Sequence, residues 1–291
     1  MKTATKIQLA GGMYRIISAA RRLVGAGDSA RVVRKGLQWQ LDLSEGIDLA
    51  IFAFGQFERI TAKSLERLVR PGAIVLDIGA NVGAHTLPLA RLVGPNGRVF
   101  AFEPTGYAFG KLKQNINLNP ELVPRIVAEQ IRLTGPGAAD PGEIYSSWKV
   151  TGQQPRHGKH FGIAKSTEGA RATSLDEYCN QADLQRIDLI KLDVDGFEVD
   201  VIRGGRNALR TYRPTICMEL SPYVLEERGA SLADLLAELR ENGYRLGDLK
   251  ARAAITDSAG ALKVKIPDGA GINVLALAKG QFFTPPSKHG V

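Results

Sequence analysis

The chain has 291 residues, 44% of them apolar, which suits one large domain, or one domain with an extension, that buries a substantial core. No run of about 18 apolar residues is present, and no short apolar segment leads to a small-residue cleavage site, so neither a membrane-spanning helix nor a secretory signal is predicted. The two cysteines, Cys179 and Cys217, lack the spacing of metal ligands. These features indicate a cytoplasmic protein in a reducing compartment.

The net charge of +8 is concentrated at one end of the chain. Residues 1–35 contain eight basic residues and a single acidic one, which leaves almost no net charge for the remainder. No stripe of interleaved basic and aromatic residues crosses that remainder. The charge therefore does not indicate nucleic-acid binding.

Residues 12–25 predict a basic amphipathic helix, because their apolar residues recur at steps of three and four while the arginines lie off that face. The apolar stripe is expected to pack on the domain. The alternative is peripheral contact with the inner face of an anionic membrane.

Two further elements are expected before the central motif. Residues 31–43 alternate loosely and predict a strand, with which residues 48–54 are expected to pair. Residues 57–68 predict a helix whose buried residues are Ile60, Leu65 and Leu68. Together these elements are expected to cover one edge of a sheet.

The stretch 74–104 has the pattern of a nucleoside-binding strand–helix–strand unit. Residues 74–78 are apolar except for Asp77, which is typical of a central parallel strand. A helix follows the loop after this strand. The loop contains three residues that allow a sharp turn and the close approach of a ligand: Gly79, Asn81 and Gly83.

Glu103 ends the second strand of this unit, 20 residues after Gly83. At about this spacing an acidic residue reaches a ribose held by the first loop. The third glycine of the dinucleotide pattern is absent, and Asp77 places a negative charge where a pyrophosphate would be disfavoured. That charge suits a cationic amine, so the predicted cofactor is S-adenosylmethionine, which carries both an amine and a ribose.

Beyond this unit the pattern alternates between helices and strands. Helices are expected over 108–117, 199–209 and 232–241, strands over 125–133, 188–194 and 215–220, and a closing hairpin from 264–266 and 273–278. Residues 134–170 differ, since they are rich in glycine, proline and basic residues. This segment is interpreted either as a lid for an anionic or polyhydroxylated substrate or as a solvated insertion.

Charged residues gather where two of the predicted strands end. Lys191 interrupts the apolar strand over 188–194, and a charge there needs a partner. Ligands bind at the carboxyl edge of an open α/β sheet, so the acids at this edge are candidates for the reaction: Asp193, Asp195, Glu198 and Glu219.

Four motifs occur in an order that resembles the FkbM family of S-adenosylmethionine-dependent methyltransferases. They are Asp-Ile-Gly-Ala-Asn-Val-Gly (77–83), Ala-Phe-Glu-Pro (101–104), Thr-Ser-Leu-Asp (173–176) and Ile-Lys-Leu-Asp-Val-Asp-Gly-Phe-Glu (190–198). The family usually has Glu where Asp195 stands, so the carboxylate there is kept with a shorter reach.

This resemblance implies a class I α/β methyltransferase fold, with a seven-stranded, mostly parallel sheet and helices on both faces. It also implies O-methylation of a hydroxyl on a sugar, glycan or polyketide-type natural product. The expected cofactor-binding residues are those of the first two motifs: Asp77, Gly79, Asn81, Gly83, Glu103 and Pro104.

A hydroxyl acceptor has a high pKa and needs a base or a metal ion beside it. Asp193 is the leading base candidate, and Lys191 is expected either to hold the neighbouring acids ionised or to lower the pKa of the acceptor. Asp195 and Glu198 have an alternative role as favourable charges at a helix N-terminus. Mg²⁺ is a further possible use of these carboxylates, although no metal ligand is assigned; His157 and His160 are alternative bases.

The predicted organisation is a basic extension over 1–30, a methyltransferase domain over 31–281 that includes the insertion 134–170, and a tail over 282–291. The alternative function is a membrane-associated binding or assembly protein that retains the fold without activity. An NAD(P)-dependent oxidoreductase is disfavoured by the missing glycine. The oligomeric state is left open.

Overall fold

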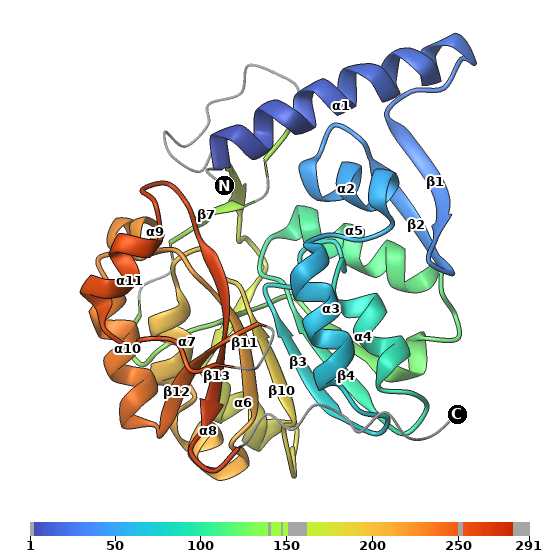
Figure 1. Ribbon diagram of the computed structural model, residues 1–291. Coiled ribbons are helices and arrows are strands. Elements are labelled where there is room, and N and C mark those ends of the chain that lie inside the picture. The colour runs from blue at the N-terminus through green and yellow to red at the C-terminus, as the bar shows by residue number, and fades with distance from the viewer. Residues whose placement is uncertain (1–2, 139–140, 147, 151–161, 250–252, 282–291) are drawn as a thin grey trace.

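The computed structural model describes residues 3–138, 141–146, 148–150, 162–249 and 253–281 (Figure 1). Its centre is a seven-stranded sheet in the order β12-β13-β11-β10-β3-β4-β5, parallel except for β13. This arrangement confirms the predicted fold class. The strands in spatial order are β12 (Tyr244–Asp248), β13 (Ile272–Ala278), β11 (Thr215–Leu220), β10 (Leu189–Leu192), β3 (Ile74–Ile78), β4 (Arg98–Phe102) and β5 (Ile126–Glu129).

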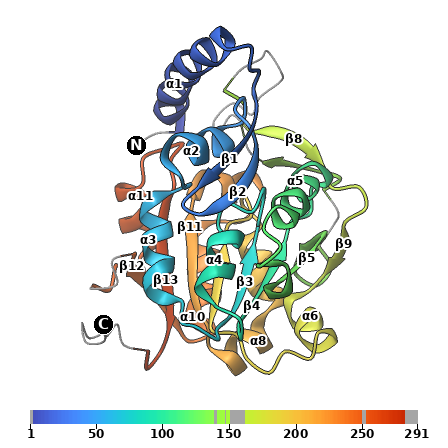
Figure 2. The same ribbon diagram turned by 90° about the vertical axis from the view of Figure 1, so that its right-hand side faces the viewer.

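Helices cover both faces of this sheet because successive strand residues point to opposite sides. On β3, Leu76 and Ile78 face one layer, whereas Val75 faces the other. The first layer contains α6 (Leu175–Gln181), α7 (Glu198–Gly204), α8 (Arg206–Tyr212) and α10 (Leu232–Glu241). The second layer, which faces the viewer in Figure 2, contains α3 (Arg59–Leu68), α4 (Thr86–Leu92) and α5 (Gly106–Asn117).

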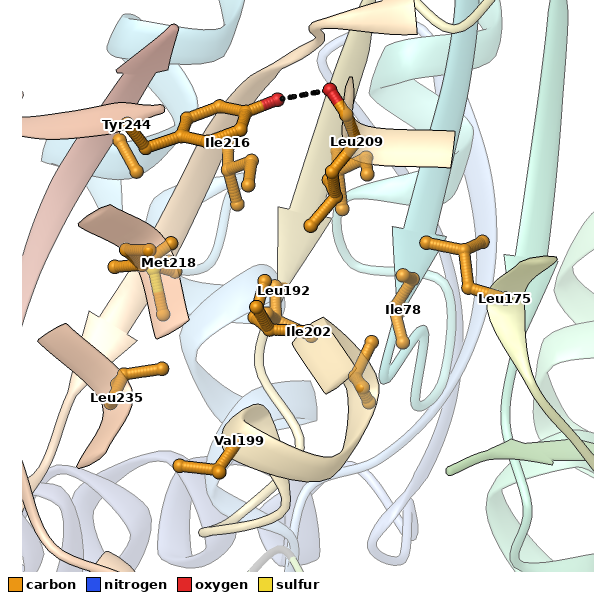
Figure 3. Close-up of a cluster of buried hydrophobic side chains, with 14 of the residues drawn as sticks. Ile78, Leu175, Leu192, Val199, Ile202, Leu209, Ile216, Met218, Leu235 and Tyr244 are labelled. Carbon is orange, nitrogen blue, oxygen red and sulfur yellow. Dashed lines mark hydrogen bonds between the residues drawn. The ribbon is translucent and has the colours of Figure 1, made fainter. Parts of the chain in front are cut away.

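The core of the first layer fixes the position of α7 (Figure 3). Leu192 and Met218 from the strands belong to the same buried cluster as Val199 and Ile202 of α7. Because α7 begins just after β10, this packing also holds the intervening loop at the carboxyl end of the sheet.

The amino-terminal segment lies above the second layer (Figures 1 and 2). It consists of α1 (Thr3–Leu23), the antiparallel hairpin of β1 (Ser29–Arg34) and β2 (Leu37–Asp42), and α2 (Gly46–Phe54). Two asparagines hold the outer edge of β2: Asn115 of α5 accepts a hydrogen bond from the Gln40 N–H at 2.8 Å, and Asn119, just beyond this helix, accepts one from the Gln38 N–H at 2.9 Å. None of the described helices is long and apolar enough to cross a membrane.

The prediction that residues 48–54 pair as a strand is wrong, because they lie within α2. The Asp48 carboxylate accepts a hydrogen bond from the backbone N–H of Asp42 at 2.6 Å, which fixes the turn into the helix. Gly55 then ends the helix in the left-handed conformation, with its N–H donating to the Ile51 carbonyl. The expected single strand over 31–43 is instead the β1–β2 hairpin. In α3, the residue Ile60 is 65% exposed rather than buried.

Other predicted boundaries also changed. The strand expected over 125–133 divides into β5 and β6 (Ile131–Leu133), which leaves the sheet and pairs with β9 (Arg171–Thr173). The helix expected over 199–209 divides at Gly205 into α7 and α8. Residues 134–170 include the hairpin of β7 (Glu143–Ser146) and β8 (Ile163–Ser166).

The expected hairpin of 264–266 with 273–278 is wrong. Val264 lies in α11 (Ala259–Lys265), where Leu262 supplies the buried contact, and β13 pairs with β12 instead. One more short helix, α9 (Pro222–Glu227), follows β11 and was not predicted. The predicted tail over 282–291 lies outside the described residues.

Candidate active site

A crevice is expected where the strand order reverses, between β3 and β10, because the chain leaves these two neighbours toward opposite sides. A cavity of about 1130 Å³ opens at the carboxyl ends of these strands. Its inner wall is formed by the loops after β3, β4 and β10, and its outer wall by residues of α1, α2, α3 and the β7 region.

The loop after β3 packs directly on the loop after β10. Gly79 has a φ of +83°, and a Cβ there would lie 1.8 Å from the Asp193 carbonyl oxygen, so no other residue fits. Asn81 also adopts a positive φ, and its backbone N–H donates to Glu103 at 2.9 Å. Its side chain donates to the Ser146 hydroxyl at 3.2 Å, which connects the loop to β7.

Glu103 organises the loop after β4. One carboxylate oxygen accepts hydrogen bonds from the backbone N–H of Thr105 at 2.9 Å and from its hydroxyl at 2.6 Å. The other oxygen accepts the hydrogen bond from the Asn81 backbone N–H. Burial raises the pKa of Glu103, and these hydrogen bonds oppose the rise. Glu103 and Pro104 both line the cavity.

Lys191 connects the two central strands at the base of the cavity. It lies opposite Asp77 in the parallel register of β10 and β3. Its ammonium donates to the Gly79 carbonyl at 3.0 Å and lies 3.6 Å from the Asp77 carboxylate and 3.3 Å from that of Asp193. Burial alone would lower the pKa of Lys191, but the two carboxylates outweigh it and the pKa is raised. Lys191 is therefore a permanent cation.

Asp77 does not have the position that the sequence suggested. Its side chain is fully buried, accepts a hydrogen bond from the Thr86 hydroxyl at 2.6 Å, and does not line the cavity. Its charge is compensated by Lys191 rather than left for a ligand amine. Gly83 does not line the cavity either: a Cβ there would lie 2.9 Å from the Leu112 side chain, so this glycine permits close packing of α5.

The predicted acids divide into two groups. Asp193, Asp195 and Glu219 line the cavity from β10, its following loop and β11. Glu198 does not line it. Its carboxylate accepts hydrogen bonds from the backbone N–H groups of Val194 and Gly196, both at 3.3 Å, and so holds the loop that carries Asp193. These contacts favour a structural role for Glu198 at the start of α7 over a role in the reaction.

Burial raises the pKa of Glu198 to about 7. The native state then binds more protons than the unfolded chain between about pH 4.5 and 7, so this residue lowers stability as the pH rises through that window. We expect Glu198→Gln to remove this loss, on the order of 3 kcal/mol, and to be more stable than the parent at pH 8 but not at pH 4.5. Urea unfolding of both proteins at the two pH values measures the difference. An equal difference at both values would contradict the burial effect.

His85 lines the cavity and was missed by the sequence analysis, which considered only His157 and His160; both of those lie outside the described residues. His85 is buried, and burial together with the nearby charge of Lys191 lowers its pKa to about 4. The imidazole is therefore neutral at pH 7. Its place two residues after Gly83, in the loop of the first motif, was the signal that could have identified it.

The described part of the 134–170 insertion closes one side of the cavity. Ile144, Ser146 and Trp148 line it, and the Trp148 ring lies so close to Gly46 that a Cβ there would be 2.6 Å away. Lys165 lies 3.6 Å from Glu45 and its ammonium sits 3.7 Å from the centre of the Tyr107 ring. That the segment acts as a lid stays a prediction.

The Methyltransferase FkbM domain model matches residues 77–246. The chain belongs to the FkbM methyltransferase family. The match begins at Asp77 and ends in β12, so it contains the loops of the inner cavity wall but none of α1, α2 or α3. In this FkbM protein the part of the outer wall that α1, α2 and α3 form thus lies outside the matched domain, whereas the β7 region lies within it.

Two relatives are methyltransferases by name, one a 2-O-methyltransferase and the other a methyltransferase of hexuronic acid. The 2-O-methyltransferase NoeI of Sinorhizobium fredii is 31% identical over 159 residues, which cover 50% of this chain and 63% of that protein. The hexuronic acid methyltransferase AglP of Haloferax volcanii is 28% identical over 141 residues, which cover 47% of this chain and 52% of that protein. The matches therefore span little more than half the length of these relatives.

Among solved structures, a putative rRNA-methylase from Clostridium thermocellum superimposes with a TM-score of 0.46 at 14% identity, covering 76% of this chain and 95% of that one. A SAM-dependent O-methyltransferase from Thermotoga maritima gives a TM-score of 0.42 at 14% identity, and the superposition covers 90% of this chain and 82% of that one.

Proposed function

We propose that this protein is an S-adenosylmethionine-dependent O-methyltransferase that acts on a hydroxyl of a sugar, a glycan or a related polyhydroxylated natural product. One observation carries the proposal: a single cavity joins Glu103 and the Gly79 loop, on the cofactor side, to Asp193 at the point where the strand order reverses. The name of NoeI supports transfer to oxygen, and the name of AglP supports a sugar-type acceptor.

The residues of the inner wall suit the cofactor. The Glu103 oxygen that accepts the Asn81 N–H has, within the described residues, one hydrogen-bond donor and retains capacity for a ribose hydroxyl. Apolar walls for a flat base are present beside it in Phe102, Ile131 and Leu133. The volume of about 1130 Å³ leaves room for an acceptor next to the cofactor.

When bound, S-adenosylmethionine supplies a methyl group already activated for displacement. The protein must then position the acceptor and take its proton. Asp193 is half-buried at the cavity wall, and its carboxylate forms an ion pair with the ammonium of Lys191 at 3.3 Å. We propose that Asp193 accepts the hydroxyl proton, while Lys191 stays protonated and holds Asp193 and the Gly79 carbonyl in place.

Metal activation has less support. In the described part of the chain, no three His, Cys, Asp or Glu side chains converge closely enough to hold a metal ion. Mg²⁺ is therefore left out of the proposed mechanism, and its involvement is tested by activity with EDTA.

We expect Glu103→Ala to weaken S-adenosylmethionine binding by about 1–3 kcal/mol, because hydroxyl groups lose a charged acceptor. Isothermal titration calorimetry with S-adenosylmethionine and S-adenosylhomocysteine measures the change, and Glu121→Gln, which removes an exposed carboxylate outside the cavity, is the control. Unchanged affinity in Glu103→Ala, or preferential binding of NAD by the parent, would refute the cofactor assignment.

Activity is tested by transfer of a labelled methyl group to glycan and glycolipid acceptors. Cofactor binding without transfer to any of them would favour the alternative of a binding or assembly protein that keeps the fold.

A further inference from the structure

The helix α1 has two different faces, and only the inner one packs against the described part of the domain. Tyr14 is buried and its hydroxyl donates to the Asp28 carboxylate at 2.9 Å. Ala10, Met13 and Ile17 pack partly against the second-layer core. The expectation that the apolar stripe packs on the domain therefore holds for Met13 and Ile17 but is wrong for Ile16, Leu23 and Val24, which are exposed.

The outer face is apolar and uncovered within the described chain. Leu9, Ile16 and Leu23, each seven residues apart and so on one side of the helix, are 62%, 74% and 88% exposed. Val24, just beyond the helix, is 80% exposed. Large apolar side chains gathered in this way on a monomer indicate an interaction surface.

A basic edge borders this apolar face. Arg15 and Arg22 precede Ile16 and Leu23 by one residue each and are exposed. By contrast, Arg21 lies on the inner side and donates to the carbonyl oxygens of Gly27 and Ser29, so it serves the fold. Two exposed cations beside an apolar stripe match the chemistry of an anionic bilayer surface, whose headgroups attract arginine while its acyl region accepts leucine and isoleucine.

We infer that the outer face of α1 docks on an anionic lipid bilayer. The helix lies at one end of the molecule, well away from the sheet, so this face is accessible (Figure 1). Leu9, Ala10 and Met13 also line the outer cavity wall, together with Phe54, which is 67% exposed. The helix therefore contributes residues both to the proposed docking face and to the cavity wall.

The test is flotation of the full chain with phosphatidylcholine vesicles that contain or lack phosphatidylglycerol, at low and high salt. We expect binding only to the anionic vesicles, with a decrease as salt rises, because exposed charges are screened over about 10 Å at 0.1 M salt. The variant Ile16→Gln/Leu23→Gln is expected to bind at least about tenfold more weakly, since two apolar anchors are lost. Arg15→Gln and Arg22→Gln are each expected to cost about fivefold.

The matched control is Val264→Gln, which removes an equally exposed apolar side chain from α11 and should bind vesicles like the parent. Melting temperatures and S-adenosylhomocysteine binding of all variants verify folding, and neither readout requires methyl transfer. Absence of flotation, equal binding to neutral vesicles, or an equal loss in Val264→Gln would overturn the inference. Self-association that disappears in Ile16→Gln/Leu23→Gln, without any vesicle binding, would assign the face to a second copy of the chain instead.

Discussion

Asp193→Asn is expected to lower the rate of methyl transfer by about 100- to 10,000-fold, the range for losing a positioned acid–base group. The amide keeps the size of the side chain but cannot accept the acceptor proton. Lys191 retains its contacts with Asp77 and the Gly79 carbonyl, so the variant is expected to fold and to bind the cofactor. Single-turnover rates with labelled S-adenosylmethionine measure the first effect, and calorimetry measures the second.

The other cavity carboxylates provide matched controls. Asp195→Asn and Glu219→Gln remove a charge from the same wall, and each is expected to have a smaller effect than Asp193→Asn because Asp193 is the proposed base and is held by Lys191 at 3.3 Å. Full activity of Asp193→Asn would transfer the role of base to Glu219 or to the neutral His85. Activity that is lost with EDTA and restored by Mg²⁺ would replace proton transfer to Asp193 by metal activation.

Lys191→Met is expected to destabilise the protein by about 3–5 kcal/mol, the cost of leaving a buried charge without its partner. Asp77 is 0% exposed and Lys191 is 4% exposed, so water cannot replace the missing ammonium. This cost is a large part of the 5–15 kcal/mol, roughly, that stabilises a typical domain. Urea unfolding followed by circular dichroism measures it.

The double variant Asp77→Leu/Lys191→Met separates charge from packing. If the loss in Lys191→Met arises from the uncompensated Asp77 carboxylate, removing both charges should recover most of the stability. A double variant as unstable as Lys191→Met would show that the loss comes from the Gly79 contact or from packing. A loss below about 1 kcal/mol in the single variant would contradict the role of Lys191 as the central cation.

The sequence by itself determined the central half of the sheet. The apolar strands β3, β4, β10 and β11 are short, continuous and bounded by turn residues, so their local pattern is strong. The pattern over residues 74–104 correctly predicted a strand–helix–strand unit, and its two strands, β3 and β4, pair in parallel. The motif at residues 190–198 correctly placed Asp193 and Asp195 at the carboxyl edge, because parallel strands end at a common edge.

Only the tertiary structure decided which charged groups form ion pairs and which side chains remain exposed. The pairing of Lys191 with Asp77 depends on the register between two strands more than 100 residues apart, which no local pattern specifies. The partner of β13 and the packing of α2 were mispredicted for the same reason: both depend on distant contacts. The two faces of α1 have similar apolar composition, so its sequence could not show that Tyr14 is buried while Ile16 and Leu23 remain exposed. That difference exists only because the β1–β2 hairpin and α2 present a surface to one side of the helix.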